Sequence, residues 1–246
     1  MANPKFRADQ LLVEQGLAEN RERAKRLIMA GLVTFYGNGC RERLDKPGRM
    51  LPADTALALK EPERFVSRGA YKLLSAIDHF RLDVTGQVAL DVGASTGGFT
   101  DCLLSHGAAR VYAVDVGKSQ LHEKLRADPR VVSLEGVNFR LAAPDLLPEA
   151  VDLAVIDVSF ISLTKILPVA KRFLKPDGYC VALVKPQFEL GPGQTDKGVV
   201  RDEVSRMRAV RMVEDAAKAS NLSPAGCVPA AIKGPKGNQE YLLLLK

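Results

Sequence analysis

The sequence of 246 residues has few cysteines and no long apolar run. Its four cysteines are far apart and form no C-x-x-C pair: Cys40, Cys102, Cys180 and Cys227. This spacing argues against a disulfide framework and a zinc site, so we expect no bound metal. The longest apolar stretches are too short to cross a membrane, and the start M-A-N-P-K-F-R lacks the apolar core of a signal peptide. We therefore expect a cytoplasmic protein that does not associate with a membrane.

Positive charge is concentrated near the start of the chain. The net charge is +6, and residues 1–60 hold 11 Lys and Arg against 7 Asp and Glu. The length suits one ordinary domain and a smaller one. We predict a small basic domain at 1–60, a linker at 61–67 and a larger domain at 68–246. A compact basic domain suggests a polyanionic partner.

The pattern in the first 60 residues predicts two helices followed by strands. Helices are expected over Arg7–Gln15 and Arg21–Ala30, with Asn20 as N-cap of the second. A strand is expected over Leu32–Tyr36, then a turn at Gly37-Asn38-Gly39 and a last strand over Thr55–Leu59. The basic residues of the second helix lie away from its apolar stripe, which is also what an ordinary solvated helix face would show.

This order of elements resembles the αL-type RNA-binding module of a small-subunit ribosomal protein and of pseudouridine synthases. The positions that match are Arg7, Leu11, Gly16, Leu17, Arg21, Ala24, Ile28, Gly31 and Val33. The resemblance implies that the small domain binds RNA. The residues expected to contact RNA are Arg7, Arg21, Arg23, Lys25 and Arg26.

A glycine-rich turn at 88–101, V-A-L-D-V-G-A-S-T-G-G-F-T-D, predicts a cofactor site. A short run of β-formers leads into the glycines, and a helical pattern follows through His106. Glycines let the backbone approach a ligand, and the following helix offers free N–H groups. Asp115 closes the next strand at the spacing of a ribose-binding carboxylate. The dinucleotide fingerprint G-x-G-x-x-G is absent, and the form D-V-G-x-x-x-G-G-F-T resembles the S-adenosylmethionine (SAM) loop of Rossmann-like methyltransferases.

Strands alternating with helices predict a doubly wound α/β sheet. Parallel strands are expected at 88–92, 111–116, 131–135, 151–158 and 179–185, with helices at 68–80 (capped by Ser67), 162–174 and 202–220 and a turn at 175–178. The last two strands, at 226–232 and 239–245, are joined by a turn too short for a helix and must be antiparallel. Dehydrogenases end with another βαβ unit instead, so the pattern favours a Rossmann-like methyltransferase.

Three polar residues end otherwise apolar strands: Asp115, Asp157 and Lys185. Ligands of open α/β sheets bind at these strand ends. A lysine at such a position can simply extend to solvent, but Asp157 on the neighbouring strand favours an ammonium–carboxylate pair in the crevice. Methyl transfer to an amino group would call for a D/N-P-P-Y/F loop after the fourth strand, where this chain has D-V-S-F. Methylation of pyrimidine C5 would call for a cysteine after proline, which is absent. An oxygen acceptor, such as a ribose hydroxyl, is favoured.

The whole chain resembles the TlyA family of rRNA 2′-O-methyltransferases, also called hemolysins, whose catalytic domain is similar to the FtsJ/RrmJ group. The resemblance rests on F-V-S-R-G-A-Y-K-L, A-L-D-V-G-A-S-T-G-G-F-T-D, V-D-V-G, I-D-V-S-F-I-S-L, L-V-K-P-Q-F-E and G-N-Q-E-Y-L. It departs at Phe65 and Asn20, where the family often has Trp and Ser. The resemblance implies SAM as cofactor, rRNA or ribosomal subunits as partner, and a cytidine ribose as acceptor.

The same resemblance assigns roles to individual residues. The catalytic tetrad falls on Lys72, Asp157, Lys185 and Glu240. Lys185 would lower the barrier to deprotonating the 2′-hydroxyl, Asp157 would orient it, and the other two would position the ribose. The expected cofactor contacts are Asp91, Gly93, Ala94, Ser95, Thr96, Gly97, Gly98, Phe99, Asp115, Asn138 and Phe139.

Two other functions are compatible with parts of the sequence. A non-catalytic ribosome-assembly factor could keep the RNA-binding module and a degenerate cofactor fold. A membrane-lysing protein would need spans or amphipathic lytic helices, which the sequence does not show. The sequence leaves open a monomer or a weak homodimer.

Overall fold

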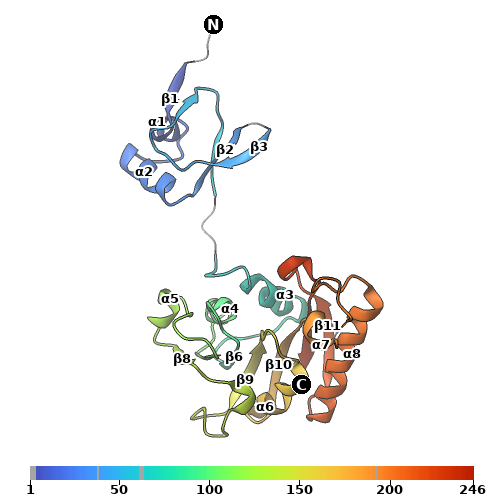
Figure 1. Ribbon diagram of the computed structural model, residues 1–246. Coiled ribbons are helices and arrows are strands. Elements are labelled where there is room, and N and C mark those ends of the chain that lie inside the picture. Colours follow the sequence, from blue (N-terminus) through green and yellow to red (C-terminus); the bar gives the residue numbers. More distant parts are fainter. Residues whose placement is uncertain (1–3, 38, 61–63, 192) are drawn as a thin grey trace. The chain divides into compact units, whose positions relative to one another are not determined.

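The computed structural model describes residues 4–37, 39–60, 64–191 and 193–246. The chain divides into a small unit, Met1–Arg64, and a large unit, Phe65–Lys246 (Figure 1). Residues 61–63 of the predicted linker and the centre of the predicted turn, Asn38, lie outside the described residues.

The small unit packs two helices against short strands. Its elements are β1 (Lys5–Arg7), α1 (Ala8–Glu14), α2 (Arg21–Met29), β2 (Val33–Gly37), β3 (Cys40–Arg43), β4 (Met50–Pro52) and β5 (Leu57–Leu59). β2 is the centre of a three-stranded antiparallel sheet, and β1 pairs with β4. The side chain of Asn20 accepts a hydrogen bond from the Arg23 N–H at 2.9 Å, which confirms it as the N-cap of α2. The sequence did not predict β1 or β4, which are three residues long.

The large unit is built on one seven-stranded sheet with the order β11-β12-β10-β9-β6-β7-β8. The strands are β6 (Val88–Val92), β7 (Arg110–Asp115), β8 (Val131–Glu135), β9 (Val151–Ile156), β10 (Leu174–Val184), β11 (Pro224–Pro229) and β12 (Tyr241–Leu245). β8, β7, β6, β9 and β10 are parallel, whereas β12 is antiparallel to both β10 and β11. The predicted Rossmann-like sheet and its final antiparallel hairpin are confirmed.

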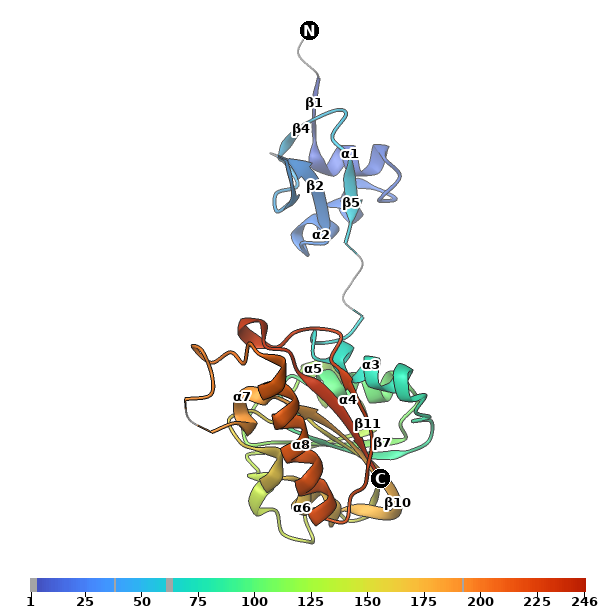
Figure 2. The same ribbon diagram turned by 90° about the vertical axis from the view of Figure 1, so that its right-hand side faces the viewer.

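Helices cover both faces of this sheet (Figure 2). One core contains apolar residues of α3 (Ala70–Phe80), α4 (Gly98–Ser105) and α5 (Glu123–Arg126). The other contains residues of α6 (Leu167–Lys171) and α8 (Glu203–Ala219). Because both faces are covered, β6, β9 and the second half of β10, residues 179–184, consist mostly of apolar residues. A polar residue that follows the end of such a strand is therefore a candidate for the functional site.

Three local predictions were wrong. The helix expected over 162–174 is a 3₁₀ turn, Leu163–Lys165, followed by the five-residue α6. Pro168 explains the break, because proline has no N–H to continue the hydrogen-bond ladder. The turn expected at 175–178 belongs to β10, whose register against β9 is irregular between Leu174 and Tyr179. α3 begins at Ala70 rather than at Arg68, and Ser67 contributes its backbone carbonyl to the Ala70 N–H rather than a side-chain cap.

Candidate active site at the carboxyl ends of the parallel strands

Two adjoining cavities open where β6, β7, β9 and β10 end. The Lys185 cavity, of about 200 Å³, is lined by Ser67, Gly69, Gly93, Ala94, Ser95, Thr96, Gly98, Phe99, Asp157, Ser159 and Lys185. The Asp115 cavity, of about 510 Å³, is lined by Val92, Gly93, Ser95, Val114, Asp115, Val116, Gln120, Val137, Asn138, Phe139, Arg140, Asp157, Val158, Ser159, Phe160, Ile161 and Ile166. Gly93, Ser95, Asp157 and Ser159 line both, so one elongated ligand could occupy the two together.

The glycine loop between β6 and α4 needs its glycines for space as well as for conformation. Gly93 has a φ of 85°, and a Cβ there would lie 2.5 Å from the Asp157 carbonyl oxygen. A Cβ at Gly98 would overlap the Ser67 hydroxyl and come within 3.0 Å of the Ala70 nitrogen. Larger residues would therefore displace the strand end or fill the hollow. The loop forms a cradle that only small residues leave open.

Asp115 is held at the edge of its cavity by backbone amides. Its Oδ2 accepts the Ser95 N–H and its Oδ1 the Gly117 N–H, both at 2.7 Å. These two bonds leave the carboxylate lone pairs that could accept ribose hydroxyls. Asn138 and Phe139 line the same cavity, and the buried Phe139 ring lies 5.7 Å from that of Phe173.

Two predicted cofactor residues line neither cavity. Gly97, at a φ of 94°, faces the Leu121 and Leu125 side chains, so its role in the structure is packing. Asp91 is fully buried behind the loop and accepts a hydrogen bond from the Thr100 hydroxyl at 2.7 Å. Burial, with a smaller contribution from the charge of Asp157, raises the pKa of Asp91 to about 7.

Lys185 and Asp157 meet as the sequence predicts. The Lys185 Nζ lies 2.5 Å from Asp157 Oδ1 and donates a hydrogen bond to the Ser159 hydroxyl at 2.9 Å. Lys185 is 7% exposed, so its ammonium points into the cavity instead of extending to solvent. Ser159 was not predicted, although it lies only two residues after Asp157 in D-V-S-F.

Lys72 and Glu240 form a second ion pair. The Lys72 Nζ donates to Glu240 Oε2 at 2.6 Å. Glu240 is fully buried, and a Cβ at Gly234 would overlap its carboxylate, so a larger residue there would shift the carboxylate. Lys72 also lines an open cleft with Arg68 and Lys233. The sequence placed Lys72 and Glu240 in one tetrad without indicating that they pair with each other.

A buried carboxylate that the sequence analysis missed connects the segments around Lys185. Glu189, in the short helix α7 (Pro186–Glu189), accepts the Ser162 hydroxyl at 2.6 Å and the Leu163 N–H at 3.0 Å. Burial raises its pKa. These bonds hold the loop after β9, which carries Ser159 and Phe160. The signal was available in K-P-Q-F-E, where a glutamate follows Lys185 by four residues.

Phe160 is the most exposed large apolar residue at the site. Its ring is 89% exposed, its φ is 63°, and its centroid lies 5.0 Å from that of Phe188. A positive φ is unfavourable for an aromatic residue, so the surrounding contacts must hold it in place. An exposed ring beside Asp157 is suited to stacking on a planar ligand.

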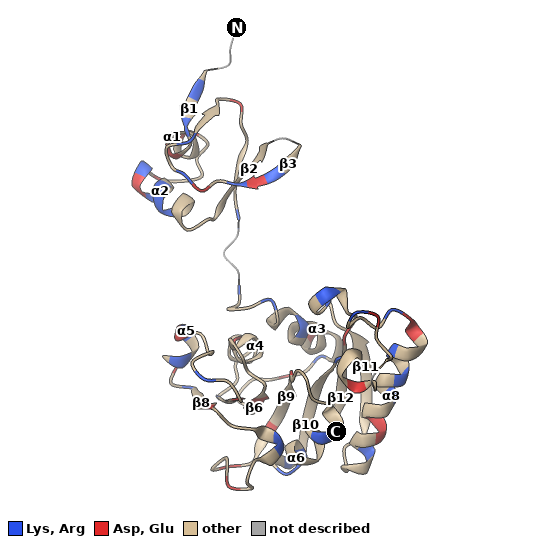
Figure 3. Ribbon diagram, viewed as in Figure 1, with Lys and Arg blue, Asp and Glu red and all other residues tan. Residues whose placement is uncertain are grey.

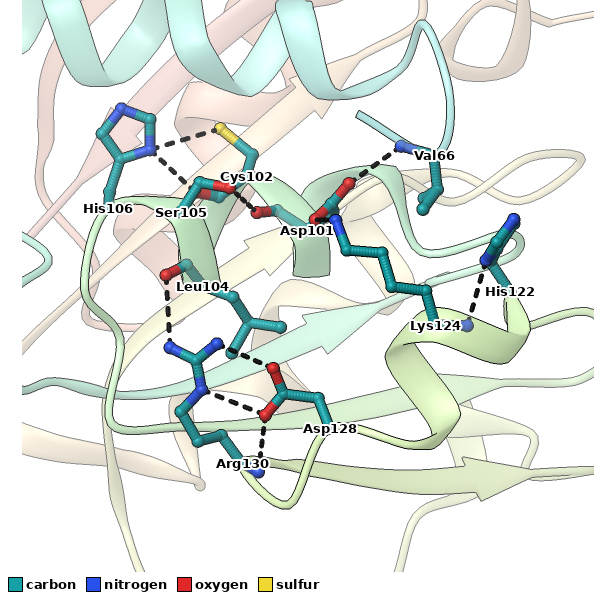
Figure 4. A network of polar contacts seen from close by, with 10 residues as sticks. All are labelled: Val66, Asp101, Cys102, Leu104, Ser105, His106, His122, Lys124, Asp128 and Arg130. Carbon is teal, nitrogen blue, oxygen red and sulfur yellow. Dashed lines mark hydrogen bonds and ion pairs between the residues drawn. The ribbon is translucent and has the colours of Figure 1, made fainter. Parts of the chain in front are cut away.

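A polar network anchors α4, the helix that follows the glycine loop (Figure 4). Asp101 Oδ2 accepts the Val66 N–H at 2.8 Å, and its Oδ1 lies 3.1 Å from the Lys124 Nζ on α5. The Ser105 hydroxyl donates to the Asp101 carbonyl at 2.7 Å. One buried aspartate therefore joins α4 to α5 and to the start of the large unit.

Figure 3 marks where Lys and Arg lie along the chain of the small unit. These basic residues differ in how they are paired. Arg7 and Arg21 both bind the buried carboxylate of Asp9, at 3.0 and 3.1 Å. Burial acts to raise the pKa of Asp9, but the hydrogen bonds from the two arginines outweigh it and hold the pKa below its usual range. Lys25 pairs with the neighbouring Glu22 at 2.6 Å. Arg23 and Arg26 are exposed and form no ion pair within the described parts of the chain. Two of the five residues predicted to contact RNA, Arg7 and Arg21, are thus held by Asp9, which the sequence did not indicate.

Neither a metal site nor a membrane span is found in the described residues. No cluster of three or more His, Cys, Asp or Glu side chains there could hold a metal ion. Within the same residues, no helix has the length and hydropathy needed to span a bilayer.

Comparison with known proteins gives consistent matches. The family model of the FtsJ-like methyltransferases matches residues 65–246. The 16S/23S rRNA (cytidine-2′-O)-methyltransferase TlyA of Mycobacterium tuberculosis is 45% identical over 98% of this chain and 89% of its own length. Hemolysin A of Brachyspira hyodysenteriae is 38% identical over 96% of this chain and 98% of its own. A solved structure from Streptococcus thermophilus, provisionally named a hemolysin, is 48% identical, covers 99% of this chain and 89% of that one, and gives a TM-score of 0.74.

Proposed function

Because the chain belongs to the FtsJ-like methyltransferases and, within them, to the TlyA group, we propose that it transfers a methyl group from SAM to the ribose 2′-hydroxyl of a cytidine in ribosomal RNA. The observation that carries this proposal is the Lys185–Asp157 pair at the junction of two cavities beside a glycine cradle. A protein acting on ribosomal RNA would work in the cytoplasm.

The residues present suit SAM. The Asp115 carboxylate would accept the ribose hydroxyls, and Asn138 and Phe139 would lie beside the adenine. The glycine loop, with Ala94, would hold the amino-acid end in the Lys185 cavity. SAM supplies an electrophilic methyl carbon, which needs a nucleophile presented in line with the sulfonium.

Lys185 would present that nucleophile. Its ammonium, buried in the cavity and fixed by Asp157 and Ser159, can hydrogen-bond the 2′-oxygen and stabilise the negative charge that develops there. The hydroxyl proton would pass to the Asp157 carboxylate or, because that side chain is 22% exposed, to water beside it. A preorganised donor of this kind contributes about 10²–10³ in rate.

The second ion pair and the exposed ring would position the target nucleotide. Lys72, at the edge of an open cleft with Arg68 and Lys233, would meet the ribose and its phosphate, while Glu240 keeps the ammonium in place. The exposed Phe160 would stack on the base once the nucleotide leaves its helix. The small unit would supply affinity for the RNA through its exposed arginines.

The test is methyl transfer from labelled SAM to ribosomal subunits by Lys185→Ala. We expect SAM affinity, measured by calorimetry, to stay within about threefold, and transfer to fall by roughly 10²–10⁴. Lys175→Ala is the matched control, because Lys175 also pairs with an aspartate, Asp152 at 2.7 Å, at the other end of β10. The control should keep full activity. Activity of Lys185→Ala within tenfold of wild type would contradict the assigned role, and absence of saturable SAM binding to the wild type would favour an assembly factor.

A further inference from the structure

The hairpin of β2 and β3 exposes one aromatic ring on the same face as two arginines. In the antiparallel register Tyr36 lies opposite Arg41, and Thr34 lies opposite Arg43. Residues directly opposite share a face of the sheet, so these four side chains form a single surface, which we call the outer hairpin face. Tyr36 is 71% exposed, whereas its neighbour Phe35 on the other face is buried in the core.

The charges of the two faces differ. On the inner face, Glu42 lies 3.6 Å from Arg49, whose guanidinium also covers the Phe35 ring at 4.6 Å. On the outer hairpin face there is no acidic residue, and Arg41 and Arg43 form no ion pair with any part of the chain that the structure describes. The outer face therefore retains its positive charge, while the inner face largely neutralises its own.

A hydrogen bond fixes Arg41, and Arg43 lies beside the end of α2. The Arg41 Nε donates to the Thr34 hydroxyl at 3.0 Å, which keeps its guanidinium over the sheet beside Tyr36. Arg43 lies over Gly31 at the end of α2, where a Cβ would overlap its guanidinium. The outer hairpin face is thereby continuous with the end of the helix that carries Arg23 and Arg26.

We infer that the outer hairpin face binds an unpaired nucleotide of the RNA, with its base stacked on Tyr36 and its flanking phosphates on Arg41 and Arg43. Aromatic rings on an exposed sheet surface are the usual platform for single-stranded bases, because every base has a π-face. A paired helix would use the arginines but leave the tyrosine without a partner. The inference rests on the proposed function, since it requires that the small unit bind RNA.

The experiment compares full-length variants on two synthetic RNA hairpins, one fully paired and one with an unpaired three-nucleotide bulge. For Tyr36→Ala we expect roughly a tenfold weaker affinity for the bulged RNA, from the lost stacking, and an unchanged dependence on salt. Tyr36→Trp should bind the bulged RNA as well as wild type does. Arg41→Ala and Arg43→Ala should each reduce the salt slope by about one, on both RNAs. Met50→Ala, which removes another exposed apolar side chain from the small unit, is the control and should change neither quantity.

The outcomes separate this inference from the proposed function. If Tyr36→Ala binds the bulged RNA like wild type, or loses the same affinity for both RNAs, stacking of an unpaired base is refuted while RNA binding by the enzyme stands. If wild type binds neither RNA and still methylates ribosomal subunits, the small unit is not an RNA anchor and the inference fails alone. If wild type binds neither RNA and also fails to methylate subunits, the proposed function is refuted, and the inference that rests on it is refuted with it.

Discussion

The buried Lys72–Glu240 pair allows its structural and catalytic contributions to be measured separately. Glu240 is fully buried, and Lys72 is 8% exposed at the edge of an open cleft. Lys72→Met leaves a buried carboxylate without its cation, and such a loss costs about 3–5 kcal/mol. Glu240→Gln should cost less, about 1–2 kcal/mol, because the cleft lets water reach the ammonium that remains.

The double variant Lys72→Met/Glu240→Gln should recover much of the free energy of unfolding that Lys72→Met loses. It contains neither charge, so we expect it to be more stable than Lys72→Met by about 2 kcal/mol. Urea unfolding at pH 7, followed with a probe in the large unit, gives the free energy of unfolding of wild type, the two single variants and the double variant. Methyl transfer should remain lost in the double variant, because Lys72 no longer positions the ribose. A Lys72→Met protein destabilised by less than about 1 kcal/mol would refute the buried-charge reasoning, and an active double variant would refute the positioning role.

Three further predictions concern the loop after β9, the buried Asp91 and the basic helix α2. Glu189→Ala should release the loop that carries Phe160, so the KM for ribosomal RNA should rise about tenfold. SAM affinity, measured by calorimetry, should fall by less, because the glycine loop and Asp115 lie on other segments of the cavity wall. Equal loss of both would indicate general unfolding instead. Asp91 has its pKa raised to about 7 by burial, so the stability it contributes is complete below its ordinary value of 3.8 and is lost as the pH rises towards 7. Thermal unfolding of Asp91→Asn should lack this decline between about pH 4 and 7, and a decline equal to that of wild type would show that Asp91 is not its source. Arg23→Ala and Arg26→Ala should each lower the salt slope of RNA binding by about one, and unchanged slopes would remove α2 from the RNA surface.

Much of the fold followed from the sequence because its signals are local. Apolar runs ending in Asp115, Asp157 and Lys185 marked parallel strands buried on both faces, and a turn too short for a helix required the final antiparallel pair. The failures were also local: Pro168 interrupted a helix that periodicity alone predicted to continue. A single proline outweighs a favourable apolar pattern because it removes a backbone donor.

The sequence predicted most residues of the site but fewer of the contacts between them. Lys185 and Asp157 could be paired because adjacent strands end at the same edge of the sheet. Lys72 and Glu240 are 168 residues apart, and nothing in either local pattern indicated their contact. Glu189 was missed for a similar reason: its partners, in the loop after β9, are defined only once the chain has folded.

The most direct test of the central claim is to identify the atom that receives the methyl group. Ribosomal subunits incubated with SAM and the protein would be digested to nucleosides and examined by mass spectrometry, for both the 16S and the 23S rRNA. We predict a new 2′-O-methylcytidine that appears with wild type and is absent with Lys185→Ala. A methyl group on a base, or an equal yield from both proteins, would contradict the role given to the lysine and aspartate that close strands β10 and β9.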